Sequence, residues 1–189
     1  MAPLIVTMWT TLDGYVAGPA DAMDWLRPDA DMMQYETGLV EEAGTLLLGR
    51  ITHADFASYW PAVARGEIDA DAGTQRYARR LDALDKVVVS ASGAIADWKG
   101  TRRLEDVTTE GIREIVATSS GPALVYGSLS VIEALARLHL IDQLDLVVHP
   151  VLLREGRALL APGQPPMGLE LKDSRPFSSG AVLLRYATG

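Results

Sequence analysis

Residues 45–52 (TLLLGRIT) contain the pattern that decides how this 189-residue chain folds. The run 45–48 is apolar and too short for a helix, which is typical of a strand buried on both faces. Gly49 follows directly, and Thr52-x-x-Asp55 fits a capping box that opens a helix. A buried strand that passes through a glycine into a helix indicates a parallel sheet covered by helices.

Short apolar runs alternate with helix-forming segments along most of the chain. We predict strands at residues 3–9, 45–48, 86–90, 123–126 and 145–151, and helices that begin near Asp29, Thr52, Asp69, Thr108 and Ser130. Pro61 is expected to end the second helix. The tail differs, because residues 169–172 and 181–186 are strand-like with no helix between them. The predicted fold class is α/β, with a central, mostly parallel sheet flanked by helices, an antiparallel C-terminal edge, and one domain over residues 1–189.

Composition and charge narrow the class of protein. The chain has 17 Lys and Arg against 25 Asp and Glu, a net charge of −8 that argues against a nucleic-acid-binding surface. It has no cysteine and three histidines without the spacing of a zinc site, so we expect no disulfide and no metal. No apolar run reaches the roughly 18 residues of a membrane span, and the start lacks the basic segment of a secretory signal. We therefore expect a soluble, cytoplasmic protein that binds neither membranes nor nucleic acids.

Three predicted strands end in residues that can hold an anion. These ends are Leu48-Gly49-Arg50-Ile51-Thr52, Ser90-Ala91-Ser92-Gly93 and Tyr126-Gly127-Ser128-Leu129-Ser130. Glycines let an anion approach the backbone, a helix start offers free N–H groups, and arginine adds a fixed charge. Each segment alone is better explained as a tight turn or a helix cap. Together, at the carboxyl edge of one sheet, they predict a ligand with several phosphates, such as a dinucleotide. The G-x-G-x-x-G, P-loop and G-x-S-x-G motifs are absent.

The order of these segments resembles that of the dihydrofolate reductase-like superfamily. The resemblance is carried by Leu12-Asp13-Gly14, Leu48-Gly49-Arg50-x-Thr52, Val88-Val89-Ser90, Val125-Tyr126-Gly127-Ser128 and the stretch from Leu140-Ile141-Asp142 to Val148-His149-Pro150-Val151-Leu152. The last two segments are similar to the riboflavin-biosynthesis reductase branch, the C-terminal domain of a bifunctional deaminase-reductase. The deaminase half is absent, so the chain resembles a stand-alone reductase domain.

The resemblance implies that NADPH lies across the sheet. The cofactor-contacting residues that it implies are Val16, Gly49, Arg50, Thr52, Ser90, Ala91, Ser92, Tyr126, Gly127, Ser128, Leu129 and Ser130. The segment at Gly49 would meet phosphates, the segment at Ser90 the adenosine 2′-phosphate, and the turn at Gly127 the pyrophosphate. A basic residue often follows the serine of the third strand in this family, whereas Ala91 stands here, which leaves the choice between NADPH and NADH open.

The resemblance also implies where the substrate lies. Asp13 and Trp25 would border it, and a carboxyl at the start of the first helix would supply a proton, with Asp31 the first choice and Asp29 the second. The alternative for both aspartates is a helix cap and an acidic first turn. The predicted function is an NADPH-dependent reductase that transfers a hydride to a small heterocyclic, pteridine-like or pyrimidine-like substrate, in a homodimer. A non-catalytic nucleotide-binding module is the alternative, and a sugar-phosphate hydrolase lacks a recognisable nucleophile.

Overall fold

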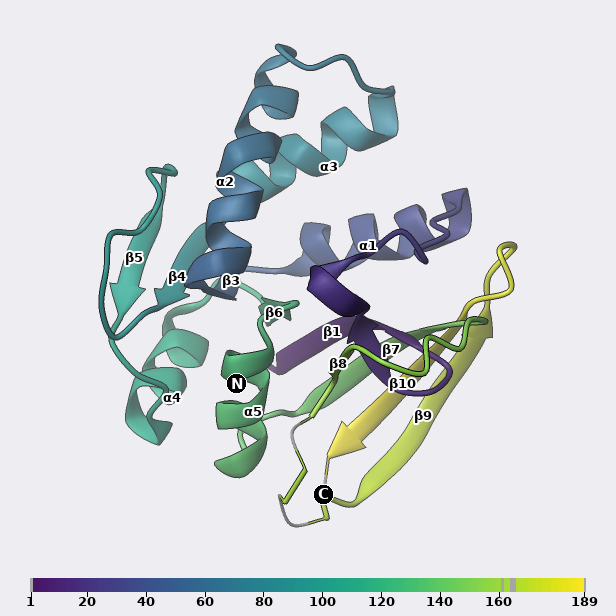
Figure 1. The fold of residues 1–189 in the computed structure, drawn as a ribbon. Coiled ribbons are helices and arrows are strands. Elements are labelled where there is room, and N and C mark those ends of the chain that lie inside the picture. The colour runs from purple at the N-terminus through teal and green to yellow at the C-terminus, as the bar shows by residue number, and fades with distance from the viewer. Residues whose placement is uncertain (1, 161, 164–165, 189) are drawn as a thin grey trace.

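An eight-stranded sheet organises the computed structural model, which describes residues 2–160, 162–163 and 166–188. Its strands are β1 (Leu4–Thr11), β3 (Thr45–Gly49), β4 (Asp85–Val89), β5 (Thr101–Leu104), β6 (Ala123–Tyr126), β7 (Gln143–His149), β9 (Leu169–Pro176) and β10 (Val182–Thr188). Their order is β5-β4-β3-β6-β1-β7-β10-β9, from the teal strands to the yellow ones in Figure 1. The first six pair in parallel, and β10 pairs antiparallel with both β7 and β9. The predicted fold class is confirmed.

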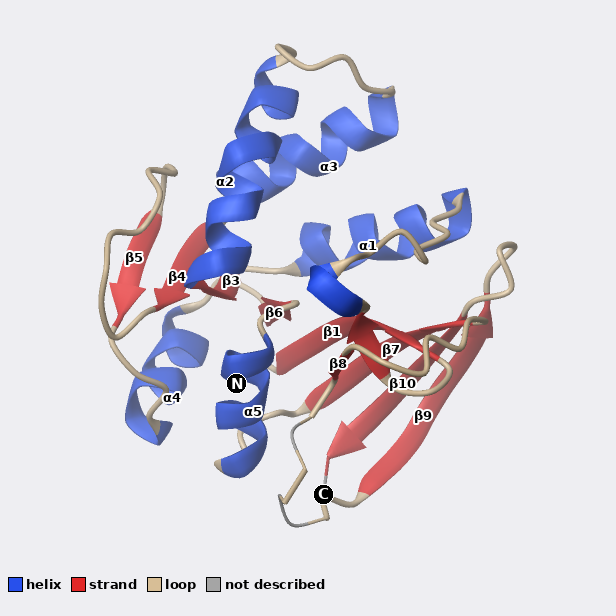
Figure 2. Cartoon of the chain, in the orientation of Figure 1, coloured by secondary structure: helices blue, strands red, loops and turns tan. Residues whose placement is uncertain are grey.

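Helices cover both faces of this sheet, as Figure 2 shows. They are α1 (Ala30–Glu42), α2 (Arg50–Arg65), α3 (Ala72–Ala83), α4 (Thr109–Thr118) and α5 (Leu129–Arg137). Successive strand residues point to opposite faces, so Leu46 and Leu48 pack in a cluster with α1, α2 and α3, whereas Leu47 packs with α4 and α5. Burial on both faces explains why β3 is a continuous apolar run.

A second, two-stranded sheet lies in segments for which the sequence predicted neither a strand nor a helix. It consists of β2 (Tyr15–Ala17) and β8 (Arg157–Ala158), and the short 3₁₀ helix η1 (Pro19–Asp21) follows β2. Gly156 precedes β8 with φ +135°, and a Cβ there would lie 2.1 Å from the carbonyl oxygen of Ala17. Only glycine fits this crossing, which holds the segment after β1 against the segment after β7.

Several helix boundaries differ from the prediction. The helix expected from Asp69 begins at Ala72, because Asp71 is the residue whose carboxylate caps it. Pro61 does not end α2 but lies inside it, and the helix continues to Arg65. Packing against α3 outweighs the lost hydrogen bond, since the rings of Trp60 and Tyr77 lie 4.9 Å apart. Asp29 caps α1 as expected, accepting from the Met32 amide at 2.8 Å.

The turn between α1 and β3 generates a stability prediction. A Cβ on Gly44 would lie 2.3 Å from the Gly121 nitrogen, whereas a Cβ on Gly38, inside α1, meets nothing within 4 Å. We expect Gly44→Ala to lower the free energy of unfolding by about 1 to 3 kcal/mol through overpacking against backbone. Gly38→Ala should raise it by about 0.5 to 1 kcal/mol through helix propensity. Urea denaturation measures both, and equal stability of the two variants would contradict the expectation.

Candidate functional site

The carboxyl ends of the parallel strands form one edge, and the three predicted anion-binding segments lie together on it. Strands β4, β3 and β6 are neighbours, and they end at Val89, Gly49 and Tyr126. Open α/β sheets bind their ligands beyond this edge. The structure therefore brings the segments that follow Gly49, Val89 and Tyr126 to the place where a ligand of this fold class would lie.

Ser128 joins two of these segments. Its hydroxyl accepts a hydrogen bond from the Gly49 amide at 2.6 Å and donates to the Thr52 hydroxyl at 3.1 Å. Gly127 beside it has φ +62°, and a Cβ on Gly49 would lie 3.1 Å from the Ser128 oxygen. Both glycines are needed for this close approach of backbone and hydroxyl. Ser128 itself is buried, whereas Gly127 and Ser130 are exposed and Leu129 is half-buried.

Two helices begin at this edge without the cap that the sequence predicted. Helix α2 begins at Arg50 and α5 at Leu129, in each case before the expected capping residue, and neither has a side-chain cap. In α1, α3 and α4, by contrast, a side chain of the N-cap residue accepts from the first turn. The first-turn N–H groups of an uncapped helix are free donors that attract anions. The two helix starts on the candidate edge are therefore the ones left open.

Two arginines flank the loop after β4. Arg50 is the first residue of α2, where the helix dipole disfavours a positive charge, and its Cδ lies 3.9 Å from the position of a Cβ on Gly93. Arg103 on β5 donates from Nε to the Ser90 carbonyl at 2.7 Å. The Ser90 hydroxyl donates to the Ser92 carbonyl at 2.6 Å, and Ala91 between them is exposed. The sequence analysis missed Arg103, because its position beside Ser90 depends on the pairing of β4 with β5.

The remaining predicted residues lie around the ends of β1 and β7. The Asp13 carboxylate accepts from the Thr11 hydroxyl at 2.6 Å and from the Leu153 and Arg154 amides, and the Thr11 bond is the main cause that lowers the pKa of Asp13. Val16 on β2 is buried in the core. Trp25 is also buried, with its ring 5.2 Å from that of His149. Asp13 thus holds the chain after β7, and Trp25 lies against the last residue of that strand.

Asp29 and Asp31 both contact the β9–β10 hairpin. Asp29 accepts from the Ser179 amide at 2.5 Å, and Asp31 accepts from the Ser178 hydroxyl at 2.5 Å. Burial raises the pKa of Asp29, but the hydrogen bonds from Met32 and Ser179 outweigh it, so this pKa is lowered. A lowered pKa holds the carboxylate ionised, which suits a helix cap better than a proton donor at neutral pH. Their catalytic role stays a prediction.

Glu36 is a buried carboxyl that the sequence analysis missed. Its carboxyl accepts hydrogen bonds from the Trp9 indole N–H at 2.7 Å and from the Tyr126 hydroxyl. The Tyr126 hydroxyl in turn accepts from the Tyr77 hydroxyl at 3.4 Å. Burial raises the pKa of Glu36 to about 7, against the lowering effect of the Tyr126 and Trp9 bonds. The helical spacing could have indicated that Glu36 is buried, because it is four residues after Met32 and three before Leu39 on the buried face of α1.

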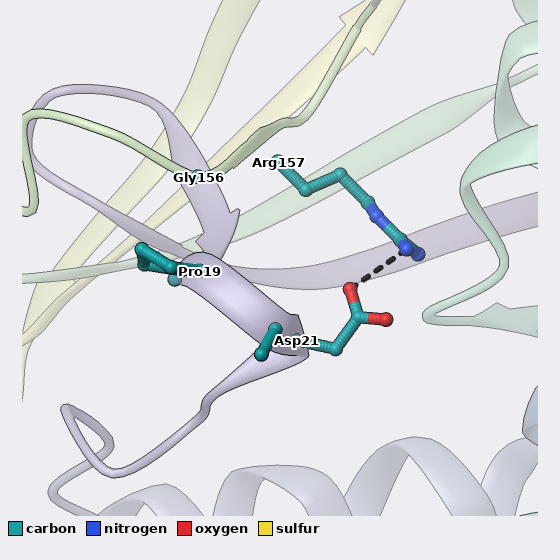
Figure 3. A pocket seen from close by; sticks show the side chains of 6 residues that line it. Pro19, Asp21, Gly156 and Arg157 are labelled. Carbon is teal, nitrogen blue, oxygen red and sulfur yellow. Dashed lines mark ion pairs between the residues drawn. The ribbon is translucent and has the colours of Figure 1, made fainter.

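A shallow hollow of about 530 Å³ lies beside this edge, between η1 and β8. Figure 3 shows Asp21 and Arg157 pointing toward each other across it, where they form an ion pair at 2.7 Å. Within residues 2–160, 162–163 and 166–188, no cluster of three or more histidine or acidic side chains is arranged to hold a metal. In the same part of the chain, no helix has the length and apolarity needed to cross a membrane.

Comparisons with known proteins show the family and the fold. Residues 2–183 match the family model of the RibD C-terminal domain. The uncharacterized protein YyaP of Bacillus subtilis (strain 168) is 27% identical over 184 residues, which cover 97% of this chain and 93% of YyaP. The fold is similar to that of a putative riboflavin biosynthesis protein from Shewanella sp. PV-4, with a TM-score of 0.74, 19% identity, and coverage of 100% of this chain and 99% of that one. It is also similar to dihydrofolate reductase from Enterococcus faecalis complexed with NADP(H), with a TM-score of 0.60, 12% identity, and coverage of 99% and 96%.

The buried carboxyl of Glu36 predicts a specific pH dependence of stability. A pKa of about 7 in the folded chain, against an ordinary value of 4.5, means that the folded state binds this proton more tightly. The resulting stabilisation is complete below pH 4.5 and is lost as the pH rises through about 7. The variant Glu36→Gln cannot ionise. Between pH 4.5 and pH 8, the free energy of unfolding of the wild type should therefore fall by about 3 kcal/mol relative to that of this variant.

Urea denaturation across this pH range measures the effect. Glu42→Gln is the matched control, because Glu42 is an exposed carboxyl on the same helix. A difference between wild type and Glu36→Gln that does not change with pH would show that the carboxyl is not held protonated.

Proposed function

The chain belongs to the RibD C-terminal domain family, and on that basis we propose that it is an NADPH-dependent reductase. Its substrate in this proposal is a small heterocycle of pteridine-like or pyrimidine-like type. The sequence resembles the reductase branch of the superfamily, and the dihydrofolate reductase of similar fold is complexed with NADP(H). When bound, NADPH supplies the hydride, so the chain itself has to bind, orient and shield the reacting groups.

The observation that carries this proposal is the pair of uncapped helix starts. Helices α2 and α5 begin next to each other, since Ser128 before α5 is bonded to Gly49 before α2. Two adjacent sets of free N–H groups suit a ligand with two linked phosphates better than a single anion. Arg50 adds a positive charge at the same place, where the helix dipole alone would disfavour it. These features fit the pyrophosphate of a dinucleotide.

Arg103 supports the choice of NADPH over NADH. The resemblance to the dihydrofolate reductase-like superfamily implies that the segment Ser90–Ser92 lies by the adenosine 2′-phosphate. The side chain of Ala91 carries no charge that could bind this phosphate. Arg103, on the neighbouring strand, donates to the Ser90 carbonyl through Nε. Its two terminal guanidinium nitrogens can therefore bind a ligand. A guanidinium can bind a phosphate through two hydrogen bonds. We propose that Arg103 provides, across the sheet, the charge that the family often has next to the serine in sequence.

Glu36 is the group that we propose holds the proton needed for reduction. A general acid works best with a pKa near the working pH, and burial raises the pKa of Glu36 to about 7. Its hydrogen bond to Tyr126 leads to the residue directly before the Gly127 turn. Glu36 is thus a positioning residue, which acts through Tyr126. It keeps a proton next to the Tyr126 hydroxyl, on a residue at the carboxyl edge of the sheet.

The expected homodimer also stays a proposal. β9 is an edge strand whose eight residues are all exposed, including Leu169 and Leu171. An exposed sheet edge with apolar side chains is a common site of pairing between chains. Two of its charged residues, Glu170 and Lys172, form an ion pair with each other at 2.6 Å.

The binding of the dinucleotide can be tested at Arg50. We expect Arg50→Ala to weaken NADPH binding by about 1.5 to 3 kcal/mol, because a charge-assisted hydrogen bond to phosphate is lost. Isothermal titration calorimetry measures the dissociation constant. Arg113→Ala, an exposed arginine on α4, is the control and should bind as the wild type does. An unchanged dissociation constant in Arg50→Ala would remove Arg50 from the site.

The choice between dinucleotides can be tested at Arg103. Arg103→Ala should reduce the preference for NADPH over NADH by about ten-fold, because one hydrogen-bonded charge is worth about 1.5 kcal/mol or more. Arg102→Ala is a close control, since adjacent strand residues point to opposite faces. The ratio of the two dissociation constants is the readout, and an equal ratio in all three proteins would exclude Arg103.

Activity separates the reductase from the non-catalytic module. Loss of the NADPH absorbance band in the presence of a pteridine or pyrimidine would support the reductase. Tight NADPH binding with no such loss for any heterocycle would favour a binding module of the same fold. If neither NADPH nor NADH binds, both the reductase and the binding module are overturned.

A further inference from the structure

Three buried nitrogen atoms near the end of β7 have no hydrogen-bond partner among the described residues. They are Nδ1 and Nε2 of His149 and Nε1 of Trp25. The relative exposure of His149 is 0% and that of Trp25 is 5%. A buried polar group without a partner costs about 1 to 3 kcal/mol, so three of them in one place call for a physical explanation.

The two rings form the centre of an aromatic cluster. The Trp25 ring meets the His149 ring edge to face at 5.2 Å, and the Trp9 ring lies on His149 at 5.7 Å. Trp9 is bonded through its indole N–H to Glu36, so its polar atom is satisfied. Apolar packing alone would be served as well by phenylalanine at position 149, without any unpaired nitrogen. The unpaired atoms are therefore confined to His149 and Trp25.

The position of His149 relates it to the proposed cofactor site. His149 is the last residue of β7 and pairs in register with Thr11 at the end of β1. Along the edge, β1 and β7 come directly after β6, whose Gly127 turn is the proposed pyrophosphate site. Adjacent strands are about 4.8 Å apart, so His149 lies about 10 Å beyond that turn. A ligand that spans β4 to β1 would end with its redox ring next to this cluster.

We propose that His149 recognises the substrate, by hydrogen-bonding the amide-like edge of a planar heterocycle, and that Trp25 covers His149 when no substrate is bound. This inference rests on the proposed reductase function and adds to it a specificity-determining residue. A lactam edge presents a carbonyl acceptor next to an N–H donor. The two imidazole nitrogens point away from each other, so His149 pairs with the lactam N–H through one nitrogen, and the Trp25 indole N–H is available for the carbonyl.

The protonation state of His149 agrees with such recognition. Burial lowers the pKa of His149, and the Asp29 carboxylate opposes this more weakly, so the imidazole is neutral at pH 7. A neutral imidazole has one donor and one acceptor nitrogen, and the Trp25 indole adds one donor. The site thus offers two donors and one acceptor to a neutral ligand. An anionic ligand would leave the acceptor nitrogen unpaired.

Binding to the NADPH-loaded protein tests the inference. The probes are uracil, lumazine and 2,4-diaminopteridine. Their binding is measured by tryptophan fluorescence and by the ¹⁵N resonances of the imidazoles. The chain has three histidines, so the signal lost in His149→Phe identifies His149. We expect a lactam-containing probe, uracil or lumazine, to bind the wild type and to shift both His149 nitrogens. His149→Phe should bind that probe at least ten-fold more weakly while keeping the wild-type dissociation constant for NADPH.

Stability separates recognition from packing. Phenylalanine has a somewhat larger planar ring without unpaired nitrogens, so removal of the unpaired atoms should offset the overpacking, and the melting temperature of His149→Phe should lie close to that of the wild type. Trp25→Phe removes the indole N–H, one of the two donors of the site, so it should weaken binding of the probe, whereas the control Trp98→Phe should bind the probe as the wild type does. Trp98 is buried elsewhere and is bonded to Asp82. His139→Asn is the control for an exposed imidazole whose φ of 52° asparagine tolerates.

Three results would overturn the inference. In the first, a heterocycle binds but leaves the His149 resonances unmoved and binds His149→Phe equally well. In the second, none of the probes binds the NADPH-loaded wild type. In the third, His149→Phe is strongly destabilised, which would assign the histidine to the core. Loss of NADPH binding by the wild type is a different result, because it contradicts the proposed function itself.

Discussion

The hydrogen bond from the Gly49 amide to the Ser128 hydroxyl is the contact on which the rest of the site depends. It joins the ends of β3 and β6, which are separated by 79 positions in sequence, at a distance of 2.6 Å. Because the Ser128 hydroxyl is used in this way, it does not cap α5, and Gly49 has no side chain with which to cap α2. One contact between backbone and side chain therefore aligns two helix starts and leaves both of them open.

An open helix start has a cost that the fold has to offset. Capping contributes about 1 kcal/mol per helix, and α1, α3 and α4 all have it. The two uncapped helices are held instead by packing: α5 by Val131, Ile132 and Leu135 in the core, and α2 by contacts with α3. Stability supplied by the apolar face of a helix frees its polar end for a ligand. The site is thus built from donors that the core does not require.

The sequence was sufficient for the order and type of most elements, because a period of two or of 3.6 survives local exceptions. The sequence predicted starts for α2 and α5 that are too late. The capping-box rule, which selected Thr52 and Ser130, assumes that the side chain of the first residue caps each helix. At these two positions the assumption fails, because Gly49 has no side chain and the Ser128 hydroxyl is bonded to the Gly49 amide. Glu36 could have been found from its spacing between Met32 and Leu39. Arg103 and His149 could not, because their neighbours are set by strand register.

The two ends of the edge use opposite electrostatic designs in a chain whose net charge is −8. At the β4–β3–β6 end, exposed Arg50 and Arg103 and free N–H groups create a local positive potential, which suits phosphates in spite of the distant negative charges. At the β1–β7 end, Glu36 and His149 are buried, and burial raises the pKa of Glu36 and lowers that of His149, which favours the neutral form of each. Neutral partners avoid the desolvation cost of an ion, so a dry pocket for an uncharged ring can lie next to a charged site for phosphates. In the proposed function, the phosphates of the ligand would therefore lie at the β4–β3–β6 end and the uncharged ring at the β1–β7 end.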